Sequence, residues 1–388
     1  MRLKIVFAFS ITLCFLACSS PEINKISTPL SEQNLRFETY DSLVVDYLGN
    51  LALMDISPDG NSFLLIDQNT DSILVTKPSG EILYQYLLKG DGPENYPSSR
   101  MGVARFISND EFVIPTQLGF FRYSIKGALL RKFEPDFNPS ATLMIPNGDN
   151  LAISGDTIFS NFSGRFYDEG LLGIEYQQKA KTIELLAMNS GDFTPIIPFP
   201  KESRFSSTEE EHPGLAYYTN LALKDDSLYI SFRNEAKIYS YSLNNLQSPA
   251  SVKNIPFKTF INALSTEDGG QNVFQIRNLF TGTINRMIPM ENAEFLIDYL
   301  SGLKDEEASE IMGIGETDFE KMFEEAEKIN TAGMLLFDGS SISPLIEKPS
   351  PLGSLNKYIS KNEIWFSLNF SEAENDYSVI YKTRLVEK

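Results

Sequence analysis

Residues 51–88 read LALMDISPDGNSFLLIDQNTDSILVTKPSGEILYQYLL, and this stretch decides the fold. It contains four runs rich in alternating apolar, β-branched and aromatic residues, a pattern typical of strands: LALMDI, SFLLID, ILVTK and ILYQYLL. The segments between these runs, SPDGN, QNTDS and PSGE, contain the Gly, Pro, Asn and Asp residues that favour tight turns. The stretch therefore predicts a four-stranded antiparallel unit.

The corner of this unit, an acidic or Asn-rich turn followed at once by an apolar strand, recurs along the whole chain. Its six copies are Asp59-Gly60-Asn61 before SFLLID, Asn109-Asp110 before EFVIP, Gly148-Asp149-Asn150 before LAIS, Asp225-Asp226 before SLYISF, Glu291-Asn292-Ala293 before EFLIDYL, and Lys361-Asn362 before EIWFSLN. Units that cannot bury their own faces must stack on their neighbours, so the recurrence predicts a repeat architecture.

Counting strands outward from each turn gives units with the same order of parts. Units three and five carry insertions, residues 155–180 and 301–333, between the strands expected to be second and third. In unit three the first two strands are expected at 142–146 and 150–154, and in unit five the fourth strand is expected at 342–348.

The sixth unit ends after three strands, whereas an unassigned strand, RFETYDSLVVDYL, lies at residues 36–48. A ring in which this N-terminal strand completes the last blade explains both facts and removes the exposed edge of an open array. We therefore predict an all-β fold, a six-bladed β-propeller closed by the N-terminal strand. A seven-bladed ring and a β-sandwich are the lesser alternatives.

The insertion in the fifth unit predicts helices, because Phe319, Met322, Phe323, Ala326 and Ile329 fall on one helical face. Thr317 and Glu320 match a capping box at its start, and a shorter helix is expected over about residues 305–312. We expect a helical hairpin lying on the propeller face.

The N-terminus, MRLKIVFAFSITLCFLACSS, has a basic start followed by an apolar run too short to span a membrane as a mature helix. The segment Phe15-Leu16-Ala17-Cys18 resembles the lipobox of bacterial lipoproteins, although leucine is commoner than Phe15 at its position. The resemblance implies a signal peptide at residues 1–17 and acyl chains such as palmitate on Cys18. Several acyl chains would make anchoring stable. An ordinary secretory peptide cut elsewhere is the alternative.

Ser19 and Ser20 follow the cysteine in place of the aspartate that often retains such lipoproteins in the inner membrane, so the outer membrane is the expected location. Residues 18–33 read as a flexible tether, and 34–388 as the propeller domain. Cys14 is lost with the signal peptide and Cys18 is lipidated, so the mature chain is expected to contain no disulfide.

The chain is strongly acidic, with 33 basic and 52 acidic residues and a net charge of −19. Loss of Arg2 and Lys4 with the signal leaves 31 basic residues against 52 acidic ones, a mature charge of −21. This charge argues against nucleic-acid partners, whose phosphates it repels. It also argues against peripheral binding to anionic lipid, which leaves the lipid anchor as the membrane contact.

The extra chain gathers on one face of the predicted propeller, where the second-to-third-strand loops and the blade connections emerge. Its segments are residues 89–100, 155–180, 201–214, 258–283 and 301–333. Binding groups concentrate on loops held by a rigid scaffold, so this face is the candidate site. The alternative is that the insertions only plug the channel and stabilise its rim.

The candidate ligand-binding residues lie near the starts of the expected innermost strands. These strands begin at the long-loop face, so their first residues could reach the mouth of the channel. These residues are Arg100, Arg105, Tyr217, Tyr218 and Arg286, and weaker candidates are Arg165, Tyr167, His212 and Arg277. In so acidic a chain the arginines could hold a carboxylate or a sugar acid through paired hydrogen bonds. Arginines that merely neutralise nearby Asp and Glu are the alternative.

Enzyme motifs are scarce. His212 is the only histidine, which excludes histidine-rich zinc sites, and its EEEHPG context predicts a solvated surface residue. A Ser–His–Asp arrangement remains open, but no G-x-S-x-G elbow accompanies it. We expect no metal, cofactor or catalytic residue, and the leading hypothesis is a non-enzymatic binding or scaffolding module. A hydrolase or lyase acting on glycans or lactones at the channel mouth is the first alternative, and a purely structural envelope protein the second.

One connection carries a family resemblance. The segment LLKGDGPENY at residues 87–96 resembles the G-x-GP-x-x-Y connection of six-bladed β-propeller lipoproteins of unknown function from Gram-negative bacteria, with Asn95 replacing the usual glutamate. The lipobox and the unit pattern over residues 34–388 agree with that family. The resemblance implies a location and a fold, and it transfers no catalytic residue.

Overall fold

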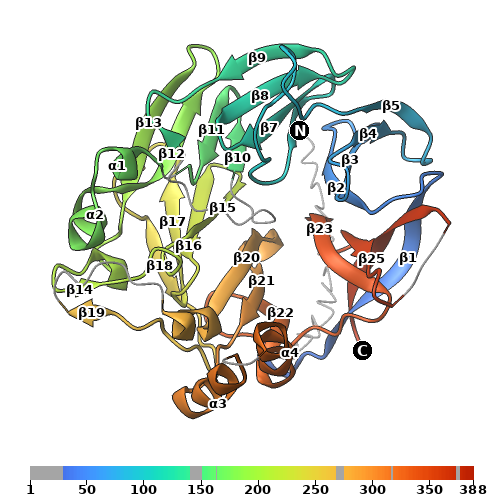
Figure 1. Cartoon of the computed structure of the whole chain (residues 1–388). Coiled ribbons are helices and arrows are strands. Elements are labelled where there is room, and N and C mark those ends of the chain that lie inside the picture. Colours follow the sequence, from blue (N-terminus) through green and yellow to red (C-terminus); the bar gives the residue numbers. More distant parts are fainter. Residues whose placement is uncertain (1–28, 140–150, 163, 268–274, 316–317, 373–375) are drawn as a thin grey trace, which may run out of the picture.

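Six small antiparallel sheets stand in a ring in the order in which the chain forms them (Figure 1). The structure is a computed structural model that describes residues 29–139, 151–162, 164–267, 275–315, 318–372 and 376–388. Five of the sheets have four strands and one has three. The fold is a six-bladed β-propeller, which confirms the predicted class.

The strands of the first three blades follow one another without crossing. Blade one contains β2 (Leu51–Ile56), β3 (Phe63–Asp67), β4 (Ile73–Thr76) and β5 (Ile82–Tyr86). Blade two contains β6 (Arg105–Ser108), β7 (Glu111–Thr116), β8 (Gly119–Ser124) and β9 (Leu129–Phe133). Blade three contains β10 (Leu151–Ser154), β11 (Thr157–Ser160), β12 (Lys181–Ala187) and β13 (Asp192–Pro198).

The second half of the ring follows the same plan. Blade four contains β15 (Thr219–Lys224), β16 (Ser227–Phe232), β17 (Lys237–Ser242) and β18 (Ser251–Asn254). Blade five contains β20 (Thr283–Pro289), β21 (Phe295–Leu300) and β22 (Ala332–Phe337). Blade six contains β23 (Leu352–Ser360), β24 (Glu363–Leu368), β25 (Ser378–Glu387) and β1 (Leu35–Val45).

The N-terminal strand closes the ring, as predicted. β1 pairs antiparallel with β25, with Leu35 opposite Glu387 at one end and Val45 opposite Ser378 at the other. The sheet order β1-β25-β24-β23 makes β1 the outermost strand of blade six (Figure 1). Both ends of the propeller domain therefore lie in one sheet, and the array has no open blade at either end.

The recurring turns join the innermost strand of a blade to its second strand in five of the six blades. Gly60, Asp225 and Asn292 have φ values of 73°, 51° and 59° in these turns. Gly, Asn and Asp tolerate this left-handed conformation better than other residues, which explains why they recur there.

Blade three departs from the predicted order of strands. Residues 151–154 form the innermost strand β10 rather than the second, and they pair with β11, which lay inside the predicted insertion. A hairpin turn with Gly155 at φ 54° joins the two strands. The strand expected at 142–146 lies outside the described residues. The insertion of this blade contains two short helices, α1 (Gly164–Asp168) and α2 (Gly173–Lys179).

Blade five has no regular fourth strand among the described residues. Ser343 and Ile346 still donate backbone hydrogen bonds to β22, at 2.9 and 2.8 Å. Pro344 lies between these two residues and has no N–H to donate, so the ladder cannot continue there. The predicted strand at 342–348 is therefore only an irregular segment alongside β22.

The insertion between β21 and β22 forms the predicted helical hairpin, α3 (Asp305–Gly315) and α4 (Phe319–Ile329). The side chain of Asp318 caps α4 by accepting a hydrogen bond from the Lys321 N–H at 2.9 Å. The predicted cap residue Thr317 lies outside the described residues. Met322 and Ala326 of the predicted apolar face pack with Phe280 and Leu303, whereas its other members, Phe319, Phe323 and Ile329, are exposed. The hairpin projects outside the ring (Figure 1), whereas the sequence predicted that it lies on the propeller face.

The connections between blades contain η3 (Arg204–Ser206), η4 (Ile276–Phe280), and the ribbon of β14 (Glu210–Glu211) and β19 (Thr266–Glu267). Two further short helices are η1 (Leu30–Glu32), which precedes β1, and η5 (Glu291–Ala293), which forms the turn between β20 and β21 of blade five. The apolar core lies between adjacent blades. For example, Leu64 and Ile66 of blade one pack in one cluster with Phe112 and Ile114 of blade two. Each blade therefore packs its faces against the neighbouring blades, and its innermost strand lies around the axis of the ring.

The N-terminal predictions fall mostly outside the described residues, because these begin at residue 29. The signal peptide at 1–17 and Cys18 are both in that undescribed part. Leu30 is buried with Leu35 and Phe37, so the packed domain includes residues before the predicted boundary at 34. Among the described residues, no helix combines the length and the apolar character needed to cross a membrane.

Candidate functional site

A cavity of about 470 Å³ lies on the axis of the ring and is lined by the innermost strands of all six blades. This volume is in the range that small-molecule sites occupy. The strands contribute Asp55, Arg105, Phe106, Leu151, Ala152, Ile153, Leu221, Ala222, Leu223, Lys224, Arg286, Met287, Ile288, Pro289, Glu291, Asn356, Lys357, Tyr358 and Ile359. We refer to this cavity as the channel.

The channel lies toward the end of the ring where each innermost strand turns into the second strand. Lys224 is the last residue of β15, Glu291 belongs to the turn after β20, and Ile359 is the last but one residue of β23. The long loops emerge at the other end. The sequence predicted a site on the long-loop face, whereas this axial cavity lies in the half nearer the short turns.

Cations exceed carboxylates in the channel lining. The described lining residues include Arg105, Lys224, Arg286 and Lys357, against Asp55 and Glu291. The chain as a whole carries a net charge of −19, so the channel is a local reversal of the protein's charge. Charges gathered in a cleft with low-dielectric walls focus the field on a ligand.

The two predicted channel arginines also join neighbouring blades. Arg105 on β6 donates to the Met54 carbonyl of β2 at 2.7 Å, and Arg286 on β20 donates to the Leu355 carbonyl of β23 at 2.5 Å. These arginines therefore combine a structural contact with a place in the channel wall.

Irregularities in the innermost strands precede two of the charged residues. The register of β2 shifts between Leu53 and Asp55, and that of β20 shifts between Ile284 and Arg286. A bulge interrupts the strict alternation of side chains and re-aims the residue that follows. Sequence alternation alone consequently gives no reliable account of which residues face the axis.

Lys357 and Asp55 form a partly buried ion pair across blades six and one, with Nζ and Oδ1 2.5 Å apart. The other carboxylate oxygen of Asp55 accepts from the Phe106 N–H at 2.8 Å. Lys224 differs from Lys357, because its ammonium has no hydrogen bond or ion pair with the described residues. Of the four channel cations, Lys224 is thus the one with the fewest polar contacts to the rest of the described protein.

Glu291 lies at the short-turn end of the channel and accepts a 2.8 Å hydrogen bond from the Tyr358 hydroxyl. Burial opposes ionisation of this carboxyl, but the Tyr358 bond and the charges of Lys224 and Lys361 outweigh it and lower the pKa of Glu291. Burial and the Glu291 carboxylate both raise the pKa of Tyr358. At neutral pH the phenol is therefore a neutral hydrogen-bond donor.

Three of the predicted site residues lie outside the channel lining. Arg100 donates to the Gly102 carbonyl beside Tyr96, where burial lowers the pKa of the guanidinium. Tyr217 is buried in an aromatic cluster and its hydroxyl is 3.2 Å from that of Tyr167. Tyr218 is also buried, at 8% exposure. Neither tyrosine lines the channel, because both precede β15, whereas the channel is lined by the later residues of that strand.

The weaker candidates on the long loops have structural roles. Arg165 bridges Glu184 and Asp136 at 2.8 and 2.7 Å. Arg277 donates to the Leu303 carbonyl at 2.7 Å and to Asp305 at 2.8 Å, which fixes the start of α3. Neutralisation of nearby acids, the alternative considered from the sequence, accounts for both.

His212 contradicts the prediction of a solvated surface residue, because it is only 1% exposed. Its Nδ1 is 3.1 Å from the Arg204 guanidinium, which can only donate, so Nδ1 accepts and the proton of the neutral ring is on Nε2. Burial first, and the Arg204 charge second, lower the pKa of His212 to about 4. The acidic residues around it in sequence suggested exposure, but the Gln177 side chain of α2 accepts a 2.7 Å hydrogen bond from the His212 backbone N–H, which holds this loop against the helix.

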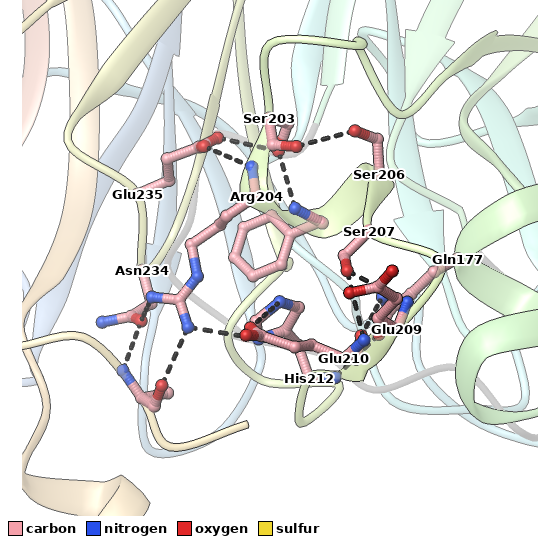
Figure 2. Close-up of polar contacts among 12 residues, drawn as sticks. Gln177, Ser203, Arg204, Ser206, Ser207, Glu209, Glu210, His212, Asn234 and Glu235 are labelled. Atoms are coloured by element: carbon pink, nitrogen blue, oxygen red, sulfur yellow. Dashed lines mark hydrogen bonds and ion pairs between the residues drawn. The ribbon is translucent and has the colours of Figure 1, made fainter. Parts of the chain in front are cut away.

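Glu235 is the centre of a second buried network, and Figure 2 shows Arg204 extending from it toward His212. The Glu235 carboxylate accepts from the Ser203 hydroxyl, the Arg204 N–H and the Tyr239 hydroxyl at 2.9, 2.9 and 2.8 Å. The Arg204 guanidinium donates in turn to Asn234 Oδ1 at 3.3 Å. This network joins the loop before β15 to the loop after β16.

The G-x-GP-x-x-Y connection has a structural role between blades one and two. Tyr96 is fully buried, with its ring centroid 6.2 Å from that of Phe121. Its backbone N–H donates to the Leu88 carbonyl and its carbonyl accepts from the Gly90 N–H, which has a φ of 150°. The motif is therefore a folded blade connection, as predicted, that inserts an aromatic ring into the interface.

No three His, Cys, Asp or Glu side chains converge as a metal-ligand group within the described ranges. The functional candidates that sequence reasoning missed are Asp55, Lys224 and Lys357. All three occupy the later part of an innermost strand, which the repeat order could have indicated, but the register shifts before Asp55 and Lys357 hide which way their side chains face.

Comparison with solved structures supports the fold. The chain is similar to a member of the DUF4221 family from Bacteroides vulgatus ATCC 8482, with a TM-score of 0.61, 12% identity, and coverage of 92% of this chain and 100% of that one. It is also similar to a protein from Bacteroides fragilis NCTC 9343 described as a "putative exported protein", with a TM-score of 0.51, 14% identity, and coverage of 92% and 95%. No protein-family model matches the sequence, and neither does any curated protein sequence. At these identities the likeness concerns the fold alone.

Proposed function

We propose that this protein is a lipid-anchored, non-enzymatic binding module of the cell envelope whose channel takes a small anionic ligand, a sugar acid or another carboxylate. The observation that carries the proposal is the excess of cations over carboxylates in the lining of an axial cavity, in a chain that is otherwise strongly acidic. Paired hydrogen bonds from arginine and point charges from lysine are the groups that recognise carboxylates.

Apolar residues such as Leu221, Met287 and Ile288 complete the channel wall. An apolar lining with a few converging polar groups is the usual character of a small-molecule site. The hydrolase or lyase alternative would need an acid–base pair or a metal here. The two carboxylates that line the channel already have partners: Asp55 forms an ion pair with Lys357, and Glu291 accepts a hydrogen bond from Tyr358. Binding is therefore the function that the geometry supports best.

Lys224→Gln tests the channel, because it removes a cation without breaking a contact between blades. We expect galacturonate to bind the purified wild-type protein and the variant to bind it about tenfold more weakly, the value of one charge-assisted hydrogen bond. Isothermal titration calorimetry at low salt measures both affinities. Lys126→Gln is the matched control, since Lys126 is exposed in the turn between β8 and β9, the two outer strands of blade two, and does not line the channel.

Galactose serves as the neutral ligand control and should bind far more weakly than galacturonate. The proposal is overturned if neither galacturonate nor any member of a panel of sugar acids and small dicarboxylates binds. Equal affinities of the wild-type and Lys224→Gln proteins would also refute the assigned role of the channel charge.

Cys18→Ala tests the lipid anchor. The sequence resemblance assigns the acyl chains to Cys18, and loss of all of them removes the membrane contact that the acidic mature chain cannot supply by charge. We expect the wild-type protein in the envelope membrane fraction and the variant in the soluble envelope fraction. Ser19→Ala is the control, and it should leave the protein in the membrane. Persistent membrane retention of Cys18→Ala would contradict the lipid anchor.

A further inference from the structure

A second cavity, of about 180 Å³, lies at the long-loop end between blades four and five. It shares no residue with the channel. Its walls come from the loop before β15, the loop after β16 and the connection that precedes β20. The lining residues are Pro213, Leu215, Ala216, Arg233, Asn234, Ala263, Asn278, Leu279, Thr281 and Thr283. We refer to it as the Arg233 pocket.

Arg233 is the only charged residue in the described lining of this pocket. Its guanidinium donates to Asn285 Oδ1 at 3.3 Å, and no carboxylate of the described residues forms an ion pair with it. Burial lowers the pKa of Arg233, and the nearby group that opposes this effect is the Tyr218 phenol rather than an acid. A desolvated guanidinium without an anionic partner is costly, and a bound anion would relieve that cost.

A second donor faces the same space. Asn278 accepts from the Leu264 N–H through Oδ1 at 3.2 Å, which fixes the amide with its nitrogen as the remaining polar atom. Thr281 donates to the Asn278 carbonyl at 3.0 Å and Thr283 donates to Asn285 at 3.1 Å, so both hydroxyl protons are engaged. Donors to a ligand are therefore the Arg233 guanidinium and the Asn278 amide.

The remaining walls are apolar. They are formed by Pro213, Leu215, Ala216, Ala263 and Leu279. The volume corresponds to about six water molecules, which is below the range of sites for drug-sized ligands. A ligand of this pocket therefore has one small anionic group and a short apolar part, whereas a multiply charged anion would lack enough donors.

The buried network of Figure 2 holds two walls of the pocket in place. Arg204 donates to Asn234 Oδ1 and to the Ala263 carbonyl, and Asn234 also accepts from the Ala263 N–H at 2.7 Å. The Asn234 amide then donates to the Ile261 carbonyl at 3.0 Å. Side chains locked by such a second layer of hydrogen bonds present a preorganised site.

We infer that the Arg233 pocket is a binding site for a small monocarboxylate with a short apolar tail, its carboxylate on the Arg233 guanidinium and the Asn278 amide, and its tail against Leu215 and Leu279. The site is separate from the channel and does not depend on the ligand proposed there.

Butyrate, with butyramide as its neutral isostere, tests this inference on the full mature domain. Titration calorimetry should show butyrate binding at least about tenfold more tightly than butyramide to the wild-type protein, because only the carboxylate gains charge-assisted bonds. Arg233→Met keeps the aliphatic stem and should remove that preference. Arg384→Met, which removes an exposed arginine paired with Glu38, is the matched control and should retain it.

Leu279→Trp narrows the pocket while leaving Arg233 in place, and it should also weaken butyrate binding. Circular dichroism establishes that each variant is folded, and the comparison of butyrate with butyramide on the wild-type protein decides the question without any variant. The inference is overturned if butyrate binds no better than butyramide. It is equally overturned if sulfate displaces butyrate at equal concentration, which would mark a site for inorganic anions.

Lys224→Gln separates this site from the channel. It should leave the affinity for butyrate unchanged, while Arg233→Met should leave the affinity for galacturonate unchanged. Loss of butyrate binding in Lys224→Gln would place the carboxylate in the channel and refute the Arg233 pocket.

Discussion

Glu235→Ala is expected to lower the free energy of unfolding by about 4 kcal/mol, since removal of one member of a buried charged network leaves its partners unsatisfied. The Ser203 hydroxyl, the Arg204 N–H and the Tyr239 hydroxyl all donate to this carboxylate, and Ser203 and Tyr239 are 4% and 0% exposed. The Lys237 ammonium is 3.4 Å from the same group. Urea unfolding at pH 7 followed by circular dichroism measures the change.

Glu209→Ala is the matched control, because Glu209 is an exposed carboxylate of the neighbouring loop with the same charge (Figure 2). Its effect should stay within about 0.5 kcal/mol. Glu235→Gln keeps one acceptor and should fall between the two. A loss below about 1 kcal/mol for Glu235→Ala would show that water replaces the carboxylate, and the network would then not be a rigid support for the Arg233 pocket.

The ring closure could be predicted from the sequence because it depends on counting. A sixth unit with three strands and an unassigned strand near the N-terminus leave one consistent topology, and β1 against β25 realises it. The α3–α4 hairpin was also predictable, since the helical period of Met322 and Ala326 matches the face that they bury. The first inference depends on the number of strand-like segments and the second on helical periodicity, and both are visible in the sequence.

Blade three shows where counting fails. The segment Gly148–Asn150 matches the other five copies in sequence, but the strand after it is the innermost one, and a hairpin turn at Gly155 joins that strand to β11. A Gly, Asn or Asp residue indicates a turn, but it does not tell which two strands of the blade the turn connects. Several turns of similar composition in one blade therefore leave the register undecided.

The sites were harder to predict than the fold, because they depend on contacts between residues distant in sequence. Arg105 and Arg286 could be predicted from their positions in the innermost strands. Lys357 forms an ion pair with Asp55 only because ring closure brings blades six and one together. Arg233 was missed because it lies in a loop of ordinary length. Its distinguishing feature is that no acid among the described residues forms an ion pair with it in an otherwise acidic chain, which only the three-dimensional arrangement reveals.

His212 has the strongest expected pH dependence. Its folded-state pKa of about 4 lies below the unfolded value of about 6.5, so between these pH values the unfolded chain binds a proton that the folded chain does not. The stability supplied by the neutral ring is therefore complete above pH 6.5 and is lost as the pH falls toward 4. The loss is on the order of 3 kcal/mol, at about 1.4 kcal/mol for each pH unit.

The physical cause lies in the groups that face the ring. Protonation of Nδ1 would end its 3.1 Å hydrogen bond with Arg204 and bring a second positive charge beside that guanidinium. Phe205 packs against the ring with centroids 5.1 Å apart, and the Glu210 carboxylate is 3.8 Å from Nε2 with 54% of its side chain exposed. Solvent screening weakens that one compensating charge.

His212→Asn isolates this effect from the many other acids that titrate in the same range. Asparagine places an acceptor oxygen near the position of Nδ1 and does not titrate. The difference in unfolding free energy between the wild-type and variant proteins, measured by urea unfolding from pH 7.5 to 4, should shrink by on the order of 3 kcal/mol as the wild-type protein loses its advantage. Parallel pH profiles for the two proteins would mean that the imidazole becomes protonated without disturbing the fold, and that the Arg204 contact is not what keeps it neutral.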